Sequence, residues 1–241
     1  PPPPPPFFFQ ASDGIRDSVA SRGLGEVYKR QPPASAQISV ERVFSLLDRT
    51  LEMGASLAMI IPGYVKEEAS LKEQRSWLLE NLCSCAEHAG SIDITLVAEN
   101  IDYPPVQPLM GLSSDCAEFA RQINSDSFRL IFDSAAPVFV DEDPLEALRT
   151  MSGFLAHIHL KNVRPVKSNE RVERFLDSTE GNRYTGVPLA EGIVDLQAVL
   201  SNLHQIEYKG YLSIEYQGET DPREVLNTDI TLVRQWYDHI D

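Results

Sequence analysis

Helical and strand periodicities alternate along this chain from residue 39 onward, and this alternation limits the possible folds more than any other feature. Apolar residues recur at helical spacing in the segments 39–53, 70–89, 113–123, 143–151, 195–205 and 222–237. Short segments between them predict strands at 56–61, 92–99, 128–133, 154–161, 183–187 and 211–216. We expect Ser39 and Asp143 to cap their helices, Gly90 to end the second helix, and a long polar loop over 162–191. With no internal linker, this order predicts one domain of βα units around a parallel sheet.

In four of the expected strands, the two faces differ in a consistent way. The even-numbered residues of 92–99, 128–133, 154–161 and 211–216 are apolar, whereas the odd-numbered residues include most of the polar side chains. A doubly wound parallel sheet is covered by helices on both faces and reads as continuous apolar runs. Polar residues on one face of successive parallel strands instead favour an enclosed interior with a polar end. The predicted fold class is therefore α/β, a (β/α) barrel.

The polar residues near the C-terminal ends of these strands form a candidate metal site, comprising Glu99, Asp133, His157, His159 and Glu215. Barrel active sites are built at this end, from residues of several strands. Taken singly, each has an ordinary structural explanation, as a solvated carboxylate, an ion pair or a hydrogen-bonded interior histidine. Taken together, carboxylates and an imidazole favour Mn²⁺, Mg²⁺ or Co²⁺ as cofactor, and Zn²⁺ also fits the donor set.

Four short motifs around these residues occur in a recognisable order, Val97–Asn100, Ile131–Asp133, His157–Val163 and Gly210–Glu215. They resemble the xylose isomerase-like TIM barrel superfamily of sugar-phosphate isomerases and epimerases. The stretch from Ala190 to Asp195 is similar to the family's Gly-Glu-Gly segment, with Ala190 in place of the first glycine. The resemblance extends from about residue 39 to residue 237.

The resemblance implies that Glu99, Asp133, His159 and Glu215 are the metal ligands, and that Glu99 and Glu215 are also the catalytic acid–base pair. Metal-assisted proton transfer beside a carbonyl would follow, with one glutamate removing the proton and the other returning it. The implied partner is a small sugar or sugar phosphate. Assembly into a homo-oligomer is left as an open alternative.

Three further residues are candidates for substrate binding. His157 is expected to line the interior rather than to bind the metal. Lys161 and Arg164 could contact a hydroxyl, carboxylate or phosphate of the substrate, although a surface charge at a strand end explains each of them equally well.

Two departures from the family pattern leave alternatives open. Ala136 stands where the family commonly has His or Asn, and Asn162 stands where it usually has Asp. A metal-dependent dehydratase acting on a cyclic polyol or keto acid, and a non-catalytic sugar-binding protein with a decayed site, are therefore the alternatives. The nuclease branch is rejected, because its additional histidines are missing and the net charge of −15 opposes DNA binding.

The segment 1–31 does not fit the rest of the chain. Six prolines precede Phe7–Phe9, and Gln10–Asp17 resembles the translation of a sequencing-library adapter, as does Ser21–Gln31. We expect residues 1–31 to be a disordered, non-native leader and residues 32–241 to be the barrel domain. These 210 residues carry a charge of −16, so the acidity belongs to the domain.

The remaining length is short for a complete barrel of about 250 residues. If the expected strands correspond to strands three to eight, about six of eight βα units are present. The sheet then has an open edge at 56–61. An inactive fragment is the alternative to an active enzyme. No apolar run is long enough to span a bilayer. The three cysteines predict reduced thiols in a cytoplasmic protein.

Overall fold

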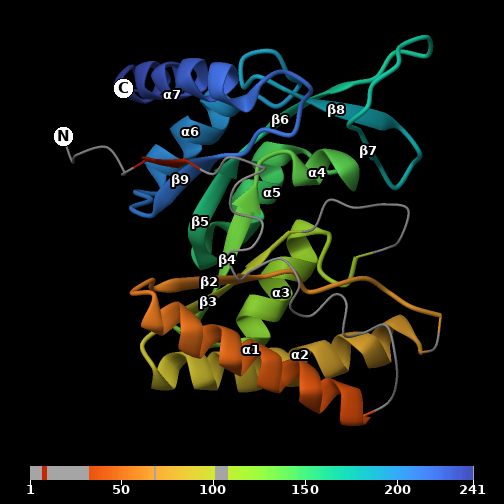
Figure 1. Ribbon diagram of the computed structural model, residues 1–241, viewed down its shortest axis with the longest axis vertical. Helices are drawn as coiled ribbons and strands as arrows, with labels where there is room; N and C mark the ends of the chain where they lie inside the picture. The colour runs from red at the N-terminus through yellow and green to blue at the C-terminus, as the bar shows by residue number, and fades with distance from the viewer. Residues whose placement is uncertain (1–6, 10–32, 68, 101–107, 241) are drawn as a thin grey trace.

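The computed structural model describes residues 7–9, 33–67, 69–100 and 108–240 (Figure 1). Its main sheet has six parallel strands in the order β1-β9-β5-β4-β3-β2. Their bounds are β1 Phe7–Phe9, β2 Leu57–Ile60, β3 Thr95–Glu99, β4 Phe128–Asp133, β5 Leu155–Leu160 and β9 Tyr211–Ile214. The helices are α1 Pro33–Glu52, α2 Leu71–Ser91, α3 Ser113–Ile123, α4 Ala136–Phe139, α5 Pro144–Met151, α6 Leu196–Gln205 and α7 Pro222–Asp238, with a 3₁₀ turn at Ser152–Phe154. The sheet is an open half-barrel.

Helix boundaries follow local capping chemistry where a capping residue is present. Ser70 and Glu73 form a reciprocal capping box at the start of α2, and Asp143 accepts hydrogen bonds from the first turn of α5, as expected. Two expectations were wrong. Helix α1 begins at Pro33 rather than after Ser39, and α2 runs through Gly90 to end at Ser91, because one glycine costs a helix only about 1 kcal/mol.

The core confirms the assignment of the two strand faces. Even-numbered residues of four strands pack with the helices into one buried cluster, among them Leu96, Leu130, Ile158 and Leu212. The odd-numbered face points away from this cluster and carries the polar side chains discussed below. Because parallel strands place their carboxyl ends at one edge, side chains that end neighbouring strands meet there.

The segment expected to be a polar loop after β5 contains a second sheet. β6 (Asn162–Pro165), β7 (Leu176–Asp177) and β8 (Arg183–Val187) pair antiparallel in the order β6-β8-β7. The prediction of 183–187 as a barrel strand was therefore wrong. We call residues 162–187 the arm; it projects at the upper right of Figure 1.

The arm is attached to the barrel by a direct contact between two backbones. A Cβ added at Gly186 of β8 would lie 2.6 Å from the carbonyl carbon of Gln217 and 2.7 Å from the nitrogen of Gly218. Real Cβ atoms do not approach other atoms this closely, so the contact requires glycine. The arm is thereby fixed beside the segment that follows β9.

Two expectations concern the edge strands of the main sheet, β2 and β1. Within the described residues β2 pairs only with β3, so the expected sheet edge at 56–61 is present. Phe7–Phe9 pairs with β9, which differs from the expectation that the leader has no structure. The rest of the leader, residues 1–6 and 10–31, lies outside the described residues. The origin of the leader stays a prediction.

Two simpler expectations can also be compared with the structure. Cys83, Cys85 and Cys116 are free thiols. In the described part of the chain, none of the helices combines the length and apolar character that a membrane span requires.

Asp229 of α7 is a buried carboxylate that lies away from the strand ends. Both of its oxygens are 3.2 Å from the backbone nitrogen of Leu189, which donates to them. Burial raises the pKa of Asp229 from 3.8 to about 6, against the lowering effect of this hydrogen bond, and nearby Glu191 adds to the rise. Because the folded-state pKa is the higher one, ionisation between about pH 4 and pH 6 destabilises the fold.

Replacing Asp229 by Asn removes this pH-dependent penalty. We expect the unfolding free energy of Asp229→Asn, relative to that of the unmodified chain, to rise by about 3 kcal/mol between pH 4 and pH 7. Urea denaturation at a series of pH values measures this difference. The comparison uses its pH dependence, so any constant loss from the altered hydrogen bond cancels. A difference that does not change with pH would contradict the prediction.

Candidate metal centre

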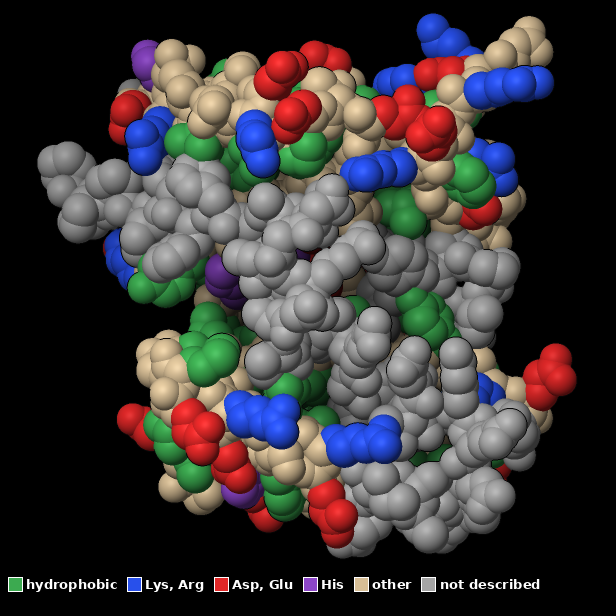
Figure 2. All heavy atoms as spheres, in the orientation of Figure 1, with side chains coloured by type: hydrophobic (Ala, Val, Ile, Leu, Met, Phe, Trp, Pro, Cys, Tyr) green, Lys and Arg blue, Asp and Glu red, His purple; other side chains and the backbone are tan. Residues whose placement is uncertain are grey.

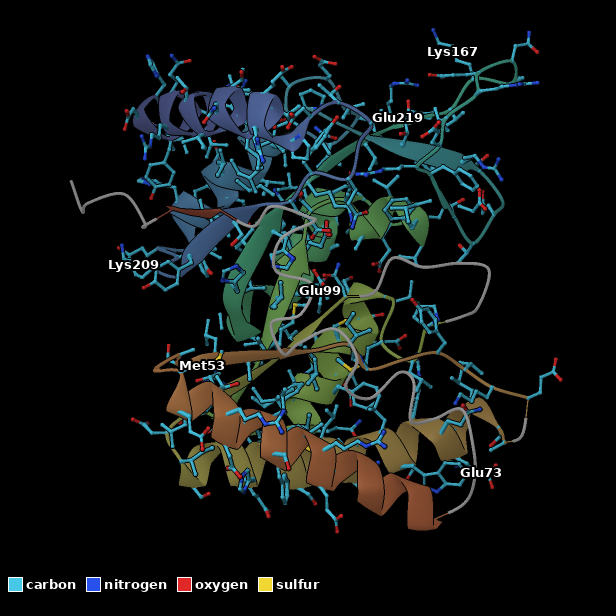
Figure 3. The ribbon with its side chains drawn as sticks, in the orientation of Figure 1. Met53, Glu73, Glu99, Lys167, Lys209 and Glu219 are labelled. Atoms are coloured by element: carbon cyan, nitrogen blue, oxygen red, sulfur yellow. The ribbon has the colours of Figure 1, made fainter. Side chains whose placement is uncertain are left out.

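Four of the five candidate residues are brought together by adjacent strands. Glu99 ends β3, Asp133 ends β4, His159 lies near the end of β5, and Glu215 directly follows β9. In the sheet register Asp133 is opposite His159, and His159 is opposite Ser213. One ligand atom of each of the four residues lies within 4.8 Å of the others. Figure 3 shows Glu99 near the centre of the molecule. We call Glu99, Asp133, His159 and Glu215 the ligand cluster.

His159 lies between the two glutamates of the ligand cluster. Its Nδ1 is 2.5 Å from Oε1 of Glu99 and 3.4 Å from Oε2 of Glu215. Burial by itself lowers the pKa of His159, but the two carboxylates outweigh it and raise the pKa well above its usual 6.5. Without a metal, the two carboxylates that face the imidazole therefore favour its protonated form.

Glu215 is held in its ionised form by two positive neighbours. Burial by itself raises the pKa of Glu215, but Lys161 and His159 lower it below its ordinary value. The Nζ atom of Lys161 is 3.5 Å from Oε1 of Glu215. Gln217 also donates to that oxygen, through Nε2 at 2.6 Å. Oε1 is thus occupied by two donors, while Oε2 faces His159.

The backbone around Asp133 is fixed by side chains of neighbouring strand ends. Asn100 Oδ1 accepts from the backbone nitrogen of Asp133 at 2.9 Å, and Asp133 Oδ1 accepts from Ala135 at 2.7 Å. Ser134 Oγ donates to the carbonyl oxygen of Lys161 and accepts from its nitrogen. Asn100, Ser134 and Gln217 were not recognised from the sequence as supporting residues, although each lies within two residues of a predicted ligand.

His157 lies beside the ligand cluster, as expected for a residue lining the interior. Its Nε2 is 2.8 Å from Oγ of Ser213, and its ring packs edge-to-face with His159 at a centroid distance of 5.2 Å. Burial, together with the charge of His159, lowers the pKa of His157 to about 4. His157 is therefore a neutral polar group, next to the place where a substrate would reach the ligands.

The two cations proposed to contact substrate lie in different surroundings. Lys161 is 1% exposed, and its Nζ is 3.3 Å from Oδ2 of Asp133, so it belongs to the ligand cluster's immediate environment. Arg164 of β6 instead forms a two-pronged ion pair with Glu170, at 2.9 and 2.5 Å, within the arm. Figure 2 shows acidic and basic side chains side by side on the arm. Substrate contact by Arg164 stays a prediction.

The two residues that depart from the family pattern are both buried. Ala136 is a buried residue of the four-residue helix α4. The Asn162 side chain donates to the carbonyl oxygens of Leu189 and Val194, at 2.8 and 3.0 Å, and its Oδ1 accepts from Val163 and Val194, both at 2.9 Å. Asn162 therefore joins the end of β5 to the loop that precedes α6.

The close packing of this loop explains the Ala-Glu-Gly stretch. A Cβ added at Gly192 would lie 1.9 Å from Oδ1 of Asn162. Glycine is therefore required at the second glycine position of the motif, and Ala190 occupies the first. The motif is a structural element of this loop.

Comparisons with known proteins agree with this architecture. A sequence model of the xylose isomerase-like TIM barrel family matches residues 25–236, beginning inside the expected leader. L-ribulose-5-phosphate 3-epimerase UlaE of Shigella boydii is 26% identical over 179 residues, which are 73% of this chain and 55% of the relative. The chain thus spans about half the length of the curated relatives it matches.

Two solved structures share the fold. The structure of an L-ribulose 3-epimerase has a TM-score of 0.70 at 19% identity, covering 91% of this chain and 74% of the other. A xylose isomerase-like TIM barrel protein from Mycobacterium smegmatis, in complex with magnesium, has a TM-score of 0.66 at 15% identity, covering 87% and 70%. With the family match covering most of the chain, the protein belongs to the xylose isomerase-like TIM barrel family.

Proposed function

We propose that the protein is a divalent-metal-dependent isomerase or epimerase of a sugar or sugar phosphate. The observation that carries the proposal is the convergence of Glu99, Asp133, His159 and Glu215 from four strands to within 4.8 Å. Related proteins named as ribulose and ribulose-phosphate 3-epimerases support the reaction class. A structural relative in complex with magnesium supports a metal-dependent reaction.

The donor set suits a hard or borderline divalent cation. Three carboxylates and one imidazole supply oxygen and nitrogen ligands of the kind that Mn²⁺, Mg²⁺, Co²⁺ and Zn²⁺ accept. Asn100, Gln217 and the Ala135 backbone bind atoms of Asp133 and Glu215, which orients these ligands. When bound, the cation would supply Lewis-acid polarisation of a sugar carbonyl.

The protein's own residues would carry the proton. Glu99 and Glu215 come from β3 and β9, which are separated in the sheet by β4 and β5. A sugar lying across the ends of β4 and β5 would therefore have one carboxylate near each side. One glutamate removes the proton from the carbon beside the carbonyl, and the other delivers a proton to the opposite face. Epimerisation at that carbon is the result.

His157 and Lys161 would contribute to the same pocket in different ways. Neutral His157 offers a ring nitrogen to a sugar hydroxyl, in exchange for its bond to Ser213. Lys161 is too deeply buried, at 1% exposed, to be a surface charge that merely attracts a phosphate. We assign it to the immediate surroundings of the ligand cluster, where it pairs with Asp133 and Glu215, rather than to the outer part of the substrate site.

The proposal is tested by two measurements on the same preparation. Mn²⁺ binding is measured by isothermal titration calorimetry. Proton exchange is measured by ¹H NMR in D₂O, with L-ribulose, L-ribulose 5-phosphate and their C3 epimers as probes. We expect saturable Mn²⁺ binding and metal-dependent loss of the C3 proton signal from at least one sugar.

The outcomes separate the proposed enzyme from the alternatives. Mn²⁺ binding without exchange on any of these sugars would favour a non-catalytic binding protein. Exchange that is accompanied by loss of water from the sugar would indicate a dehydratase. A protein that binds no divalent cation would refute the metal centre and, with it, the proposed reaction.

A further inference from the structure

A buried lysine lies directly beside the ligand cluster. Lys161 follows β5 directly and is 1% exposed, with its Nζ 3.3 Å from Oδ2 of Asp133 and 3.5 Å from Oε1 of Glu215. Two proposed ligands thus share one buried ammonium group. Charged side chains are almost never fully buried unless they are paired, and two of the proposed ligands are partners of this one.

The position of Lys161 is fixed by its backbone as well as by its charge. Its nitrogen donates to Oγ of Ser134 at 2.9 Å, and its carbonyl oxygen accepts from the same hydroxyl at 2.7 Å. Ser134 follows Asp133 immediately, so the bond joins the ends of β4 and β5. The ammonium therefore cannot leave Asp133 and Glu215 by a simple movement of the main chain.

We propose that Lys161 is the internal counter-charge of the metal centre, holding Asp133 and Glu215 together in the metal-free protein and lowering the affinity for divalent cations. The inference rests on the metal site of the proposed function. It deepens that function, because it names the residue that sets how tightly the cation is held.

A count of formal charges supports this role. With His159 neutral as a ligand, the three carboxylates carry −3, so a divalent cation together with Lys161 brings the centre to zero, whereas a divalent cation alone leaves −1. In the metal-free protein, Lys161 offsets one of the carboxylate charges that would otherwise repel one another inside the fold. Like-charged groups this close interact strongly where water is excluded.

The same charge opposes the incoming metal. A divalent cation bound by Asp133 and Glu215 shares those carboxylates with the Lys161 ammonium, and the two positive charges repel each other across a few ångströms. Removing the ammonium should therefore have opposite effects on two properties. The metal-free fold loses a favourable ion pair, and the cation gains affinity.

The test compares Lys161→Met, which keeps a long unbranched side chain without the charge, with the unmodified chain. Thermal unfolding in the presence of EDTA measures the metal-free fold, and titration with Mn²⁺ alone measures the affinity. We expect Lys161→Met to lower Tm in EDTA and to lower the Kd for Mn²⁺ at least tenfold. The same two measurements on Lys209→Met, at an exposed lysine, should show neither change (Figure 3).

A charge-conserving variant distinguishes the effect of the lost charge from a general effect of altered packing. Lys161→Arg should retain a Kd within about threefold of the unmodified value, because the positive charge remains near the carboxylates. If Lys161→Met is unfolded in EDTA but folds on addition of Mn²⁺, the proposal is supported in its strongest form. If it stays unfolded at saturating Mn²⁺, or binds Mn²⁺ no more tightly than the unmodified chain, the proposal is overturned.

Failure of this inference can be told apart from failure of the proposed function. If the unmodified chain does not bind Mn²⁺, the proposed metal centre itself is refuted. If the unmodified chain and Lys161→Met bind Mn²⁺ with the same affinity, the proposed metal centre is supported and only the proposed role of Lys161 is refuted.

Discussion

Replacing Glu215 by Gln is expected to slow proton exchange on one of the two epimeric sugars by about 10²- to 10⁴-fold, the range typical of a lost general acid or base. The amide keeps the shape of the side chain, and its oxygen can still bind a cation. It cannot accept a proton from carbon at neutral pH. The rate of exchange of the C3 proton is measured by ¹H NMR in D₂O at saturating Mn²⁺. The probes are the sugar that exchanges fastest in the unmodified chain and its C3 epimer.

Glu99→Gln supplies the decisive comparison, because the two glutamates are assigned to opposite faces of the sugar. Each variant should lose interconversion of the epimers, and the exchange that remains should be confined to one epimer, a different one for each variant. Glu219→Gln is the matched control, since this exposed residue lies on the loop after β9 and outside the ligand cluster (Figure 3). Unchanged exchange of both epimers in Glu215→Gln would contradict the two-glutamate mechanism.

The second large effect concerns folding. Asn162→Asp is expected to lower the free energy of unfolding by about 3 kcal/mol or more, since it buries a charge and leaves buried carbonyl groups without donors. The orientation of the amide is fixed by its partners, two carbonyl oxygens on one side and two backbone N–H groups on the other. A carboxylate satisfies only the N–H groups and places its second oxygen against the carbonyls of Leu189 and Val194.

Urea denaturation at pH 7.5 measures this loss, and two further variants locate its cause. Asn227→Asp makes the same chemical change at an exposed position of α7 and should alter stability by less than about 0.5 kcal/mol. Gly192→Ala should destabilise the fold, because its Cβ would lie 1.9 Å from Oδ1 of Asn162. Equal stability of Asn162→Asp and the unmodified chain would show that Asn162 does not hold the loop.

The ligand cluster could be predicted from the sequence because two simple regularities apply to it. Side chains alternate between the faces of a strand, so Glu99, Asp133 and His159 had to share a face once the strands were located. Parallel strands end at the same edge, so those side chains had to meet there. Both statements depend on sequence spacing alone, and the structure confirms the convergence.

The arm could not be predicted in the same way. β6 reads Asn-Val-Arg-Pro and β8 reads Arg-Tyr-Thr-Gly-Val, which are short, polar and without the apolar alternation of a barrel strand. Their pairing is antiparallel and joins segments far apart in the chain, so neither strand identifies its partner. The ion pair of Arg164 with Glu170 depends on this fold of the arm, which is why the sequence suggested substrate contact instead.

The amide and hydroxyl groups that support the site were missed for a different reason. Asn100, Ser134 and Gln217 act through single hydrogen bonds to a ligand or to the backbone beside it. Polar residues of these types are common at strand ends, and their partners depend on distances of a few tenths of an ångström. Only the three-dimensional arrangement distinguishes such a contact from solvation.

The arm interrupts the chain between β5 and β9 without interrupting the sheet. The two strands remain neighbours, with His159 opposite Ser213, and Gly186 fixes the arm against the backbone at residues 217 and 218. None of the four residues of the ligand cluster lies within residues 162–187. A change of sequence or length toward the tip of the arm therefore need not displace any proposed metal ligand.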